Sequence, residues 1–151
     1  MGHHVTLENL IAAELEEVQR LLALLSQEQD ALIDRQFDRV SQLIDAKSAA
    51  LQQLELASTQ RAQYCAAQAL QSVDAIEAAL GPAVQIWFDL LQNAKLAETM
   101  NRTNGQLIKT HEEVNQYLMS TLAAQRNPNV GYSADGKLSQ LTSISRPFDR
   151  A

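Results

Sequence analysis

Glycine and proline are missing from most of the first half of the chain, with neither present between His3 and Leu80. These two residues are the strongest interrupters of regular structure, so their absence argues against a series of short elements joined by tight turns. The same stretch is rich in Ala, Leu, Glu and Gln, which are all good helix formers. The sequence therefore predicts one long helical segment there, or two helices joined by a short turn.

The chain is also poor in cysteine and in long apolar runs. Cys65 is the only cysteine, which excludes an internal disulfide and suits a reducing compartment. No stretch approaches the roughly 18 consecutive apolar residues that a membrane span needs. The N-terminus lacks the basic region, apolar run and cleavage site of a signal peptide. We therefore expect a cytoplasmic protein without stable membrane insertion.

Basic residues are scarce in all but the last segment. Residues 1–124 carry 8 basic and 16 acidic side chains, a net charge of −8, whereas residues 125–151 carry 4 basic and 2 acidic side chains, a net charge of +2. Nucleic-acid binding requires a basic footprint, so this acidic body argues against it. With 151 residues, 46% of them apolar, the chain is long enough to bury one core without a metal or a disulfide.

Two long helices are expected in the first half. Thr6 is placed to cap the first helix, with Val5 and Leu10 at the flanking staple positions. The expected seam of this helix advances in steps of four and three residues, which keeps one stripe on a partner helix: Ile11, Leu15, Val18, Leu22, Leu25, Gln29 and Leu32. Asp34 is a candidate N-cap for the second helix. The seam of that helix runs through Phe37, Val40, Ile44, Lys47, Leu51, Leu54, Ser58, Arg61 and Cys65.

Two cations and one thiol lie on this second seam. The stems of Lys47 and Arg61 can pack in the seam while their charged heads reach water or a carboxylate. Cys65 has no histidine near it in sequence, so we interpret it as a buried structural thiol.

A break and a last long helix follow. A shorter helical piece is expected over residues 72–80, and Gly81-Pro82 then interrupts the chain with Pro placed to start the next helix. That helix is expected to run from about residue 83 to residue 125, with Gly105 as a candidate bend. Its predicted apolar face consists of Val84, Trp87, Phe88, Leu91, Ala94, Ile108, Leu118 and Leu122.

The remaining residues differ in composition. They hold two of the three prolines and two of the five glycines, and Ser133-Ala134-Asp135-Gly136 has the composition of a turn. They carry too little apolar surface to fold alone. We therefore predict an all-α fold, a bundle of long antiparallel helices over residues 5–125, followed by a flexible C-terminal tail over residues 126–151.

No sequence pattern typical of an enzyme is present. His111-Glu112-Glu113-Val114-Asn115 resembles half of a zinc-protease motif, but that chemistry needs a second histidine where Asn115 stands. No other His or Cys lies near enough in sequence to complete a metal site, and the chain has no Gly-rich phosphate loop or nucleophile elbow. We expect no catalytic residues, no metal and no cofactor.

Polar residues interrupt the apolar stripe of the last helix at Asn101, Asn104, His111 and Asn115. Buried polar residues in a helical seam often set its register at some cost in stability. Alternatively, this half of the helix is not fully packed in the free protein and is kept for a partner. The sequence leaves both interpretations open.

Two motifs resemble those of the FlgN-type flagellar export chaperones. Asn101-Arg102-Thr103-Asn104-Gly105-Gln106-Leu107-Ile108 is similar to that family's N-x-x-N-G-x-L-I signature. Tyr132-Ser133-Ala134-Asp135-Gly136 resembles its Y-x-x-D-G tail motif, with Ser133 at a position where Gly is common. Lys47 and Arg61 also fit the family's second-helix pattern.

The resemblance implies a helical bundle that binds the hook-filament junction proteins FlgK and FlgL in the cytoplasm, prevents their premature assembly and delivers them to the flagellar type III export gate. The partner-binding residues that it implies are Asn104, Leu107, Ile108, Val114, Tyr117, Leu118 and Leu122. The tail motif implies docking to the export gate by Tyr132, Asp135 and Gly136. The alternative hypothesis is a self-associating helical-bundle adaptor unrelated to secretion.

Overall fold

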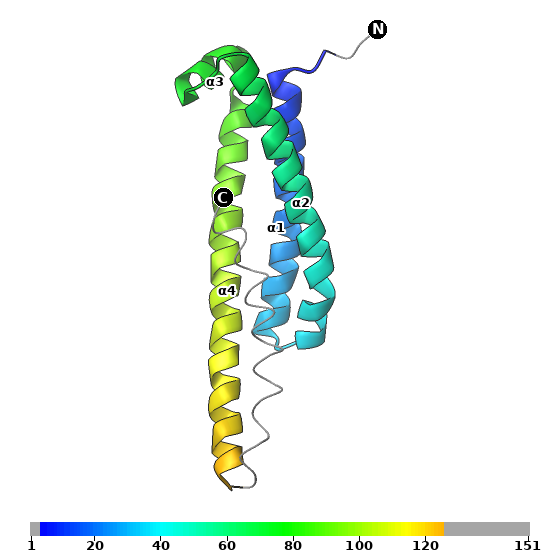
Figure 1. The fold of residues 1–151 in the computed structure, drawn as a ribbon, viewed down its shortest axis with the longest axis vertical. Helices are drawn as coiled ribbons and strands as arrows, with labels where there is room; N and C mark the ends of the chain where they lie inside the picture. Colours follow the sequence, from blue (N-terminus) through cyan, green and yellow to red (C-terminus); the bar gives the residue numbers. More distant parts are fainter. Residues whose placement is uncertain (1–3, 126–151) are drawn as a thin grey trace. The chain divides into compact units, whose positions relative to one another are not determined.

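The computed structural model describes residues 4–125, and every regular element in that range is helical (Figure 1). The elements are α1 (Leu7–Ile33), α2 (Phe37–Ala67), α3 (Val73–Leu80), the 3-10 turn η1 (Gly81–Ala83) and α4 (Gln85–Gln125). The predicted all-α fold is therefore confirmed. The predicted tail, residues 126–151, lies outside the described residues.

Side-chain caps start two of the helices. The Thr6 hydroxyl accepts a hydrogen bond from the backbone N–H of Asn9 at 3.2 Å, as the sequence predicts for the N-cap of α1. The Ser72 hydroxyl accepts from the backbone N–H of Ala75 at 3.1 Å and caps α3 in the same way. Each cap satisfies an amide that has no partner inside its own helix.

The turn between α1 and α2 differs from the prediction. Asp34 does not begin α2: its N–H still bonds to the carbonyl of Asp30 at 3.0 Å, and α2 starts at Phe37. Arg35 has a φ of 57°, and the next N–H, that of Gln36, reaches back to the Ala31 carbonyl at 2.8 Å. This is a Schellman closure, which usually places glycine at the left-handed position.

The end of α2 repeats this closure. Ala69 has a φ of 56°, and the N–H of Leu70 bonds to the Cys65 carbonyl at 2.8 Å. Both helices therefore end at residues other than glycine, which explains how two helix ends fit into a stretch without glycine or proline.

The chain forms two compact units. Of the described residues, unit 1 comprises residues 4–24 and 47–97, and unit 2 comprises residues 25–46 and 98–125. In unit 1, α1, α2, α3 and α4 contribute apolar side chains that are less than one-tenth exposed: Leu7, Ile11, Val18, Leu21, Ala57, Cys65, Ile76, Leu80, Trp87, Leu90 and Ala97. The prediction that residues 5–125 form one domain stays a prediction.

Unit 2 has a small core of its own. Its buried cluster consists of Ala31, Leu32, Val40 and Ile108, with Ile44 and Leu107 packed against it. The α1–α2 turn makes these two helices antiparallel. The second halves of α1 and α4 run parallel, because Asn104 bonds to Leu25 and His111 to Leu32, each pair 79 residues apart. The α2 segment is thus antiparallel to both neighbours, as a bundle of long helices predicts.

The buried seams differ in places from the predicted ones. In α1, the sequence predicts Leu15 and Gln29 at seam positions, but Glu14 and Glu28 are the buried residues there, 5% and 4% exposed. In α4, Leu90 is buried, whereas Phe88 and Leu91 are 42% and 45% exposed. Carboxylates can occupy the α1 seam because both have hydrogen-bond partners in the fold. The α4 helix continues through Gly105.

Candidate partner-binding surface

The last turns of α4 carry apolar side chains that the described residues leave exposed. Val114, Tyr117, Leu118 and Leu122 have exposed fractions of 46%, 72%, 52% and 55%. Their spacing of three and four residues places Val114, Leu118 and Leu122 on one face of the helix, with Tyr117 at its edge. We call these four residues the α4 stripe. Three large aliphatic side chains on one exposed helical face are typical of a surface that pairs with another helix.

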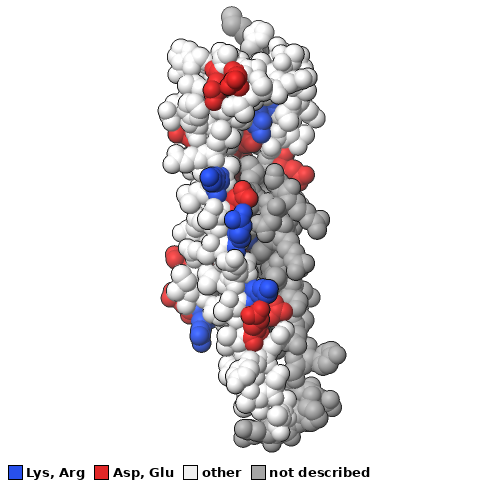
Figure 2. Space-filling view, turned by 90° about the vertical axis from the view of Figure 1, so that its left-hand side faces the viewer, with Lys and Arg blue, Asp and Glu red and all other residues white. Residues whose placement is uncertain are grey.

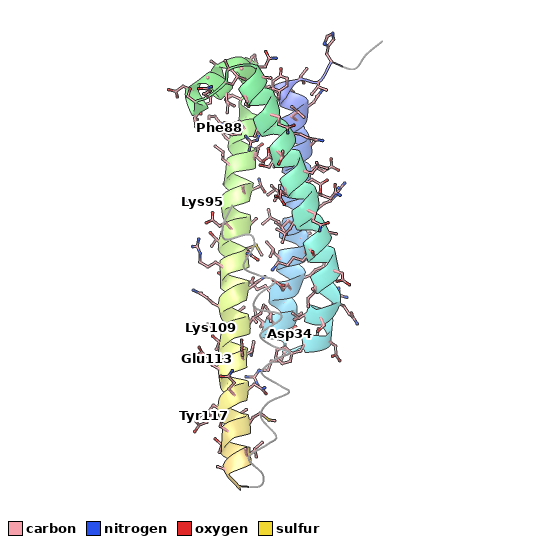
Figure 3. The ribbon with its side chains drawn as sticks, in the orientation of Figure 1. Asp34, Phe88, Lys95, Lys109, Glu113 and Tyr117 are labelled. Carbon is pink, nitrogen blue, oxygen red and sulfur yellow. The ribbon has the colours of Figure 1, made fainter. Side chains whose placement is uncertain are left out.

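The stripe is exposed because α4 extends further than its neighbours. Nε2 of His111 lies 3.0 Å from the carbonyl oxygen of Leu32, and α1 ends one residue later, at Ile33. The 13 residues 113–125 of α4 continue past this point, a length of about 20 Å at 1.5 Å per residue. In Figure 3, Tyr117 lies on this extension, beyond the α1–α2 turn where Asp34 is labelled.

Three other predicted binding residues lie inside unit 2. Asn104 and Ile108 are 0% and 1% exposed, and Leu107 is half-buried against the core cluster. The structure thus divides the seven predicted residues into an inner group of three and the exposed α4 stripe. Asn104 and Ile108 can meet a partner only if α4 leaves α1, and the role of all three residues in binding stays a prediction.

Hydrogen bonds hold α4 to α1 in unit 2. The Nδ2 amide of Asn104 donates to the carbonyl of Leu25 at 2.9 Å and to Oε1 of Glu28 at 3.0 Å. His111 bonds to the Leu32 carbonyl, and its ring meets the edge of Phe37 with centroids 5.4 Å apart. Of the two interpretations that the sequence left open for these polar positions, the contacts of Asn104 and His111 favour packing within the chain.

Unit 1 contains a cluster of Glu14, Arg61 and Trp87, and the sequence alone did not indicate that these residues lie together. Nε and Nη2 of Arg61 both donate to the carboxylate of Glu14, the second bond measuring 3.2 Å. The guanidinium carbon lies 5.5 Å from the ring centroid of Trp87, within the range of a cation–π contact. Burial lowers the pKa of Arg61, but the hydrogen bond and the charge of Glu14 outweigh it and raise the pKa above its ordinary value. Arg61 therefore reaches a carboxylate, as its seam position predicts.

The second seam cation behaves differently. Lys47 is 2% exposed, so its ammonium group does not reach water as an exposed head would. A fully buried lysine is rare in proteins unless its charge is compensated. The sequence predicted that the ammonium group of Lys47 would reach either water or a carboxylate, and its burial excludes contact with bulk water.

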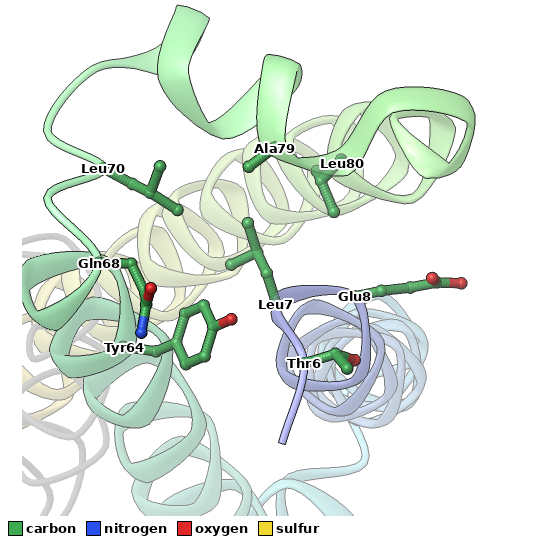
Figure 4. A pocket seen from close by; sticks show the side chains of 8 residues that line it. All are labelled: Thr6, Leu7, Glu8, Tyr64, Gln68, Leu70, Ala79 and Leu80. Atoms are coloured by element: carbon green, nitrogen blue, oxygen red, sulfur yellow. The ribbon is translucent and has the colours of Figure 1, made fainter. Parts of the chain in front are cut away.

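A shallow cavity of about 330 Å³ opens at one end of unit 1 (Figure 4). It is lined by Thr6, Leu7, Glu8, Tyr64, Gln68, Leu70, Ala79 and Leu80. Glu8 is the only carboxylate in this lining, so the cavity does not bring together the acid and base pair that proton-transfer catalysis uses. Within residues 4–125, no group of three or more His, Cys, Asp or Glu residues could hold a metal ion.

One face of the described residues is of mixed charge (Figure 2). On the face shown in Figure 2, Lys and Arg side chains are interspersed with Asp and Glu, without a broad basic area among the coloured residues. Such a mixture is unlike the basic patch of a nucleic-acid-binding protein. None of the helices described by the structure is long and apolar enough to cross a membrane.

The residues predicted to dock to the export gate, Tyr132, Asp135 and Gly136, lie outside the described part of the chain. Their role stays a prediction that depends on the motif alone.

Comparison with known proteins identifies one family. The family described as FlgN protein matches residues 1–140, which is nearly the whole chain. No curated protein and no solved structure matches the chain. The match agrees with the Asn-Asn-Gly motif on α4 and confirms the family that the sequence predicts. The chain belongs to the FlgN family of flagellar export chaperones.

Proposed function

We propose that this flagellar export chaperone binds the terminal helices of the hook-filament junction proteins FlgK and FlgL in the cytoplasm. It would prevent their premature assembly and deliver them to the export gate. FlgN is a family of chaperones and not of enzymes, which supports a role that needs no catalysis. The observation that most directly supports the proposal is the exposed α4 stripe.

The proposed mechanism is the pairing of an amphipathic client helix with the extension of α4. The buried Ile108 and the half-buried His111 are followed at the same three- and four-residue steps by Asn115, Leu118 and Leu122. A client helix that packs there would continue the seam beyond the α1–α2 turn, where α1 ends and α2 begins, in the manner of helix-in-groove recognition. Terminal helices of a junction protein would be amphipathic, and the chaperone would cover their apolar faces.

Leucine burial contributes to the expected affinity. Leu118 and Leu122 are about half exposed, and completely burying such a side chain contributes roughly 1.5–3 kcal/mol. The remaining burial on binding is therefore worth roughly 1 kcal/mol per leucine. An aspartate in the same place would add the desolvation of a charge, which is far more costly.

The test is a pair of matched double variants on α4. Leu118→Asp with Leu122→Asp places two charges on the stripe, whereas Gln116→Asp with Ser120→Asp places two charges on exposed positions of the opposite face. Calorimetric titration with FlgK or FlgL should show at least a hundredfold loss of affinity for the first variant and less than a threefold change for the second. Circular dichroism verifies that both variants remain helical.

Equal affinities for the two variants would refute the proposed site. The alternative function, a self-associating adaptor, would use the same stripe to pair two copies of the chain. Light scattering and a pull-down from a lysate separate the two: a stable homo-oligomer that captures no flagellar client supports the adaptor.

The tail is proposed to serve a second step. Tyr132, Asp135 and Gly136 would dock to the export gate while the α4 stripe holds the client. The support for this proposal is the resemblance of the tail motif to that of the family, whose match extends through residue 140. Separate sites for client and gate would allow transfer without competition between them.

A further inference from the structure

The face of α4 that packs in unit 2 is mostly polar. Its buried positions are Asn101, Asn104 and Ile108, and the half-buried His111 and Asn115 continue the same seam. Ile108 is the one member of this set that joins the apolar core cluster. This polarity contrasts with the first part of α4 in unit 1, where the buried seam residues are Trp87, Leu90 and Ala97.

Asn104 requires a particular partner. Both N–H bonds of its amide are used, one by the Leu25 carbonyl and one by Oε1 of Glu28. The Glu28 side chain is only 4% exposed, so the pair lies in the interior, where a lost hydrogen bond is not replaced by water. The apolar stripe of an ordinary amphipathic helix presents no acceptors at these two points.

His111 recognises a second feature of α1. Its Nε2 donates to the Leu32 carbonyl in the last turn of α1, and this carbonyl also accepts the backbone N–H of Arg35 at 3.2 Å in the closure of the helix. The edge of Phe37, the first residue of α2, packs against the same imidazole. A histidine placed in this way fits the end of a helix and the start of the next, a combination that a continuous client helix lacks.

We propose that Asn104 and His111 are self-recognition residues, which make residues 98–112 of α4 selective for the α1 sequence of this protein and disfavour pairing with a foreign helix or with the α4 of a second copy. Within the part of α4 that belongs to unit 2, residues 113–125 are then the segment that is open to a client. An apolar helix laid over Asn104 would leave the two N–H groups of its amide unpaired. That penalty disfavours association by about 5- to 150-fold. The part of this proposal that concerns the client depends on the proposed function, whereas the part that concerns self-association does not.

The first experiment measures self-association of the full-length protein. Asn104→Leu replaces the amide by an apolar group of similar size, and Ile108→Leu is the matched control, because it places a leucine one turn later without removing a polar group. Sedimentation velocity over a concentration series should show that Asn104→Leu associates at least about fivefold more strongly than the unchanged protein. Ile108→Leu should not differ from the unchanged protein.

Adding His111→Leu to Asn104→Leu should strengthen association further. If both variants stay helical and associate no more strongly than the unchanged protein, the proposal is wrong. Should Asn104→Leu fail to fold, His111→Leu alone carries the test, since it leaves the Asn104–Glu28 contact in place. His111→Leu must then associate more strongly than the unchanged protein, and an unchanged association would overturn the proposal.

The second experiment maps the client footprint by amide exchange with FlgK. Protection gained by the unchanged protein should be confined to residues 113–125 of α4, and in Asn104→Leu it should extend back to about residue 104. New protection across residues 98–112 of the unchanged protein would overturn the proposal. No binding of any junction protein would refute the proposed function and leave the sedimentation result valid.

Discussion

The Glu14–Arg61 pair predicts a large and specific effect on stability. Its side chains are 7% and 20% exposed. Breaking a buried ion pair by removing one partner costs about 3–5 kcal/mol, because the other charge is left without compensation. In Glu14→Leu, the guanidinium retains a contact to the Ser58 hydroxyl at 3.5 Å and its position over Trp87, and its partial exposure admits water. We therefore expect a smaller loss, about 2–3 kcal/mol.

Urea unfolding followed by circular dichroism measures this loss as a free energy of unfolding. For a chain of 151 residues, about 3 °C of melting temperature corresponds to each kcal/mol, so the melting temperature should fall by about 6–9 °C. The double variant Glu14→Leu with Arg61→Met removes both charges and keeps the volume. It should recover to within about 1 kcal/mol of the unchanged protein, because replacing a buried pair by apolar residues is often neutral.

Two results would refute this reasoning. A loss below about 0.5 kcal/mol for Glu14→Leu would mean that Arg61 is solvated well enough not to need the carboxylate. A double variant at least as unstable as Glu14→Leu would mean that packing, and not charge compensation, sets the effect. The matched control is Glu16→Leu, because the Glu16 side chain is 64% exposed and its pair with Arg20 lies on the surface. It should change the stability by less than about 0.5 kcal/mol.

Three further predictions concern helix ends, exposed apolar residues and the tail. Arg35→Gly should raise the free energy of unfolding by about 0.5–1 kcal/mol in a urea titration, because glycine adopts the left-handed backbone at φ 57° without strain; a loss of stability would contradict this. Phe88→Ser should cost less than about 1 kcal/mol by the same measurement, because 42% of the side chain is exposed. Tyr132→Ala should leave FlgK affinity within threefold and weaken binding to an export-gate domain at least tenfold by calorimetry; equal losses for both would remove the separate docking role.

Helix positions were predictable from the sequence because local signals determine them. The cap at Thr6 and the break at Gly81-Pro82 depend on residues within one turn, and the structure has helix boundaries at both places. The start of α2 was missed because Arg35 closes α1 in a conformation that usually requires glycine. Asp34 is a good capping residue on its own, but the hydrogen bonds of the closure determine where the helix ends.

The content of the seams was less predictable, because long-range partners determine it. Glu14 and Glu28 look like surface residues until Arg61 and Asn104 are brought to them across the fold. The exposed positions of Leu118 and Leu122 follow a regular apolar pattern, yet the pattern does not show that α1 ends level with His111. The sequence therefore predicted an apolar pattern along α4, and the lengths of the neighbouring helices determine which residues at its end stay exposed.

The burial of Trp87 has a consequence for spectroscopy. It is the only tryptophan of the chain, it is 5% exposed, and it lies in unit 1. Indole emission under selective excitation therefore reports the environment of unit 1, with the Arg61 guanidinium over the ring as a nearby charge. The α4 stripe belongs to unit 2, and its one aromatic residue is a tyrosine, which selective excitation of tryptophan does not excite. Capture of a client that lacks tryptophan should thus leave the emission spectrum unchanged, and a spectral shift on capture would be an optical record of unit 1 responding to an event in unit 2.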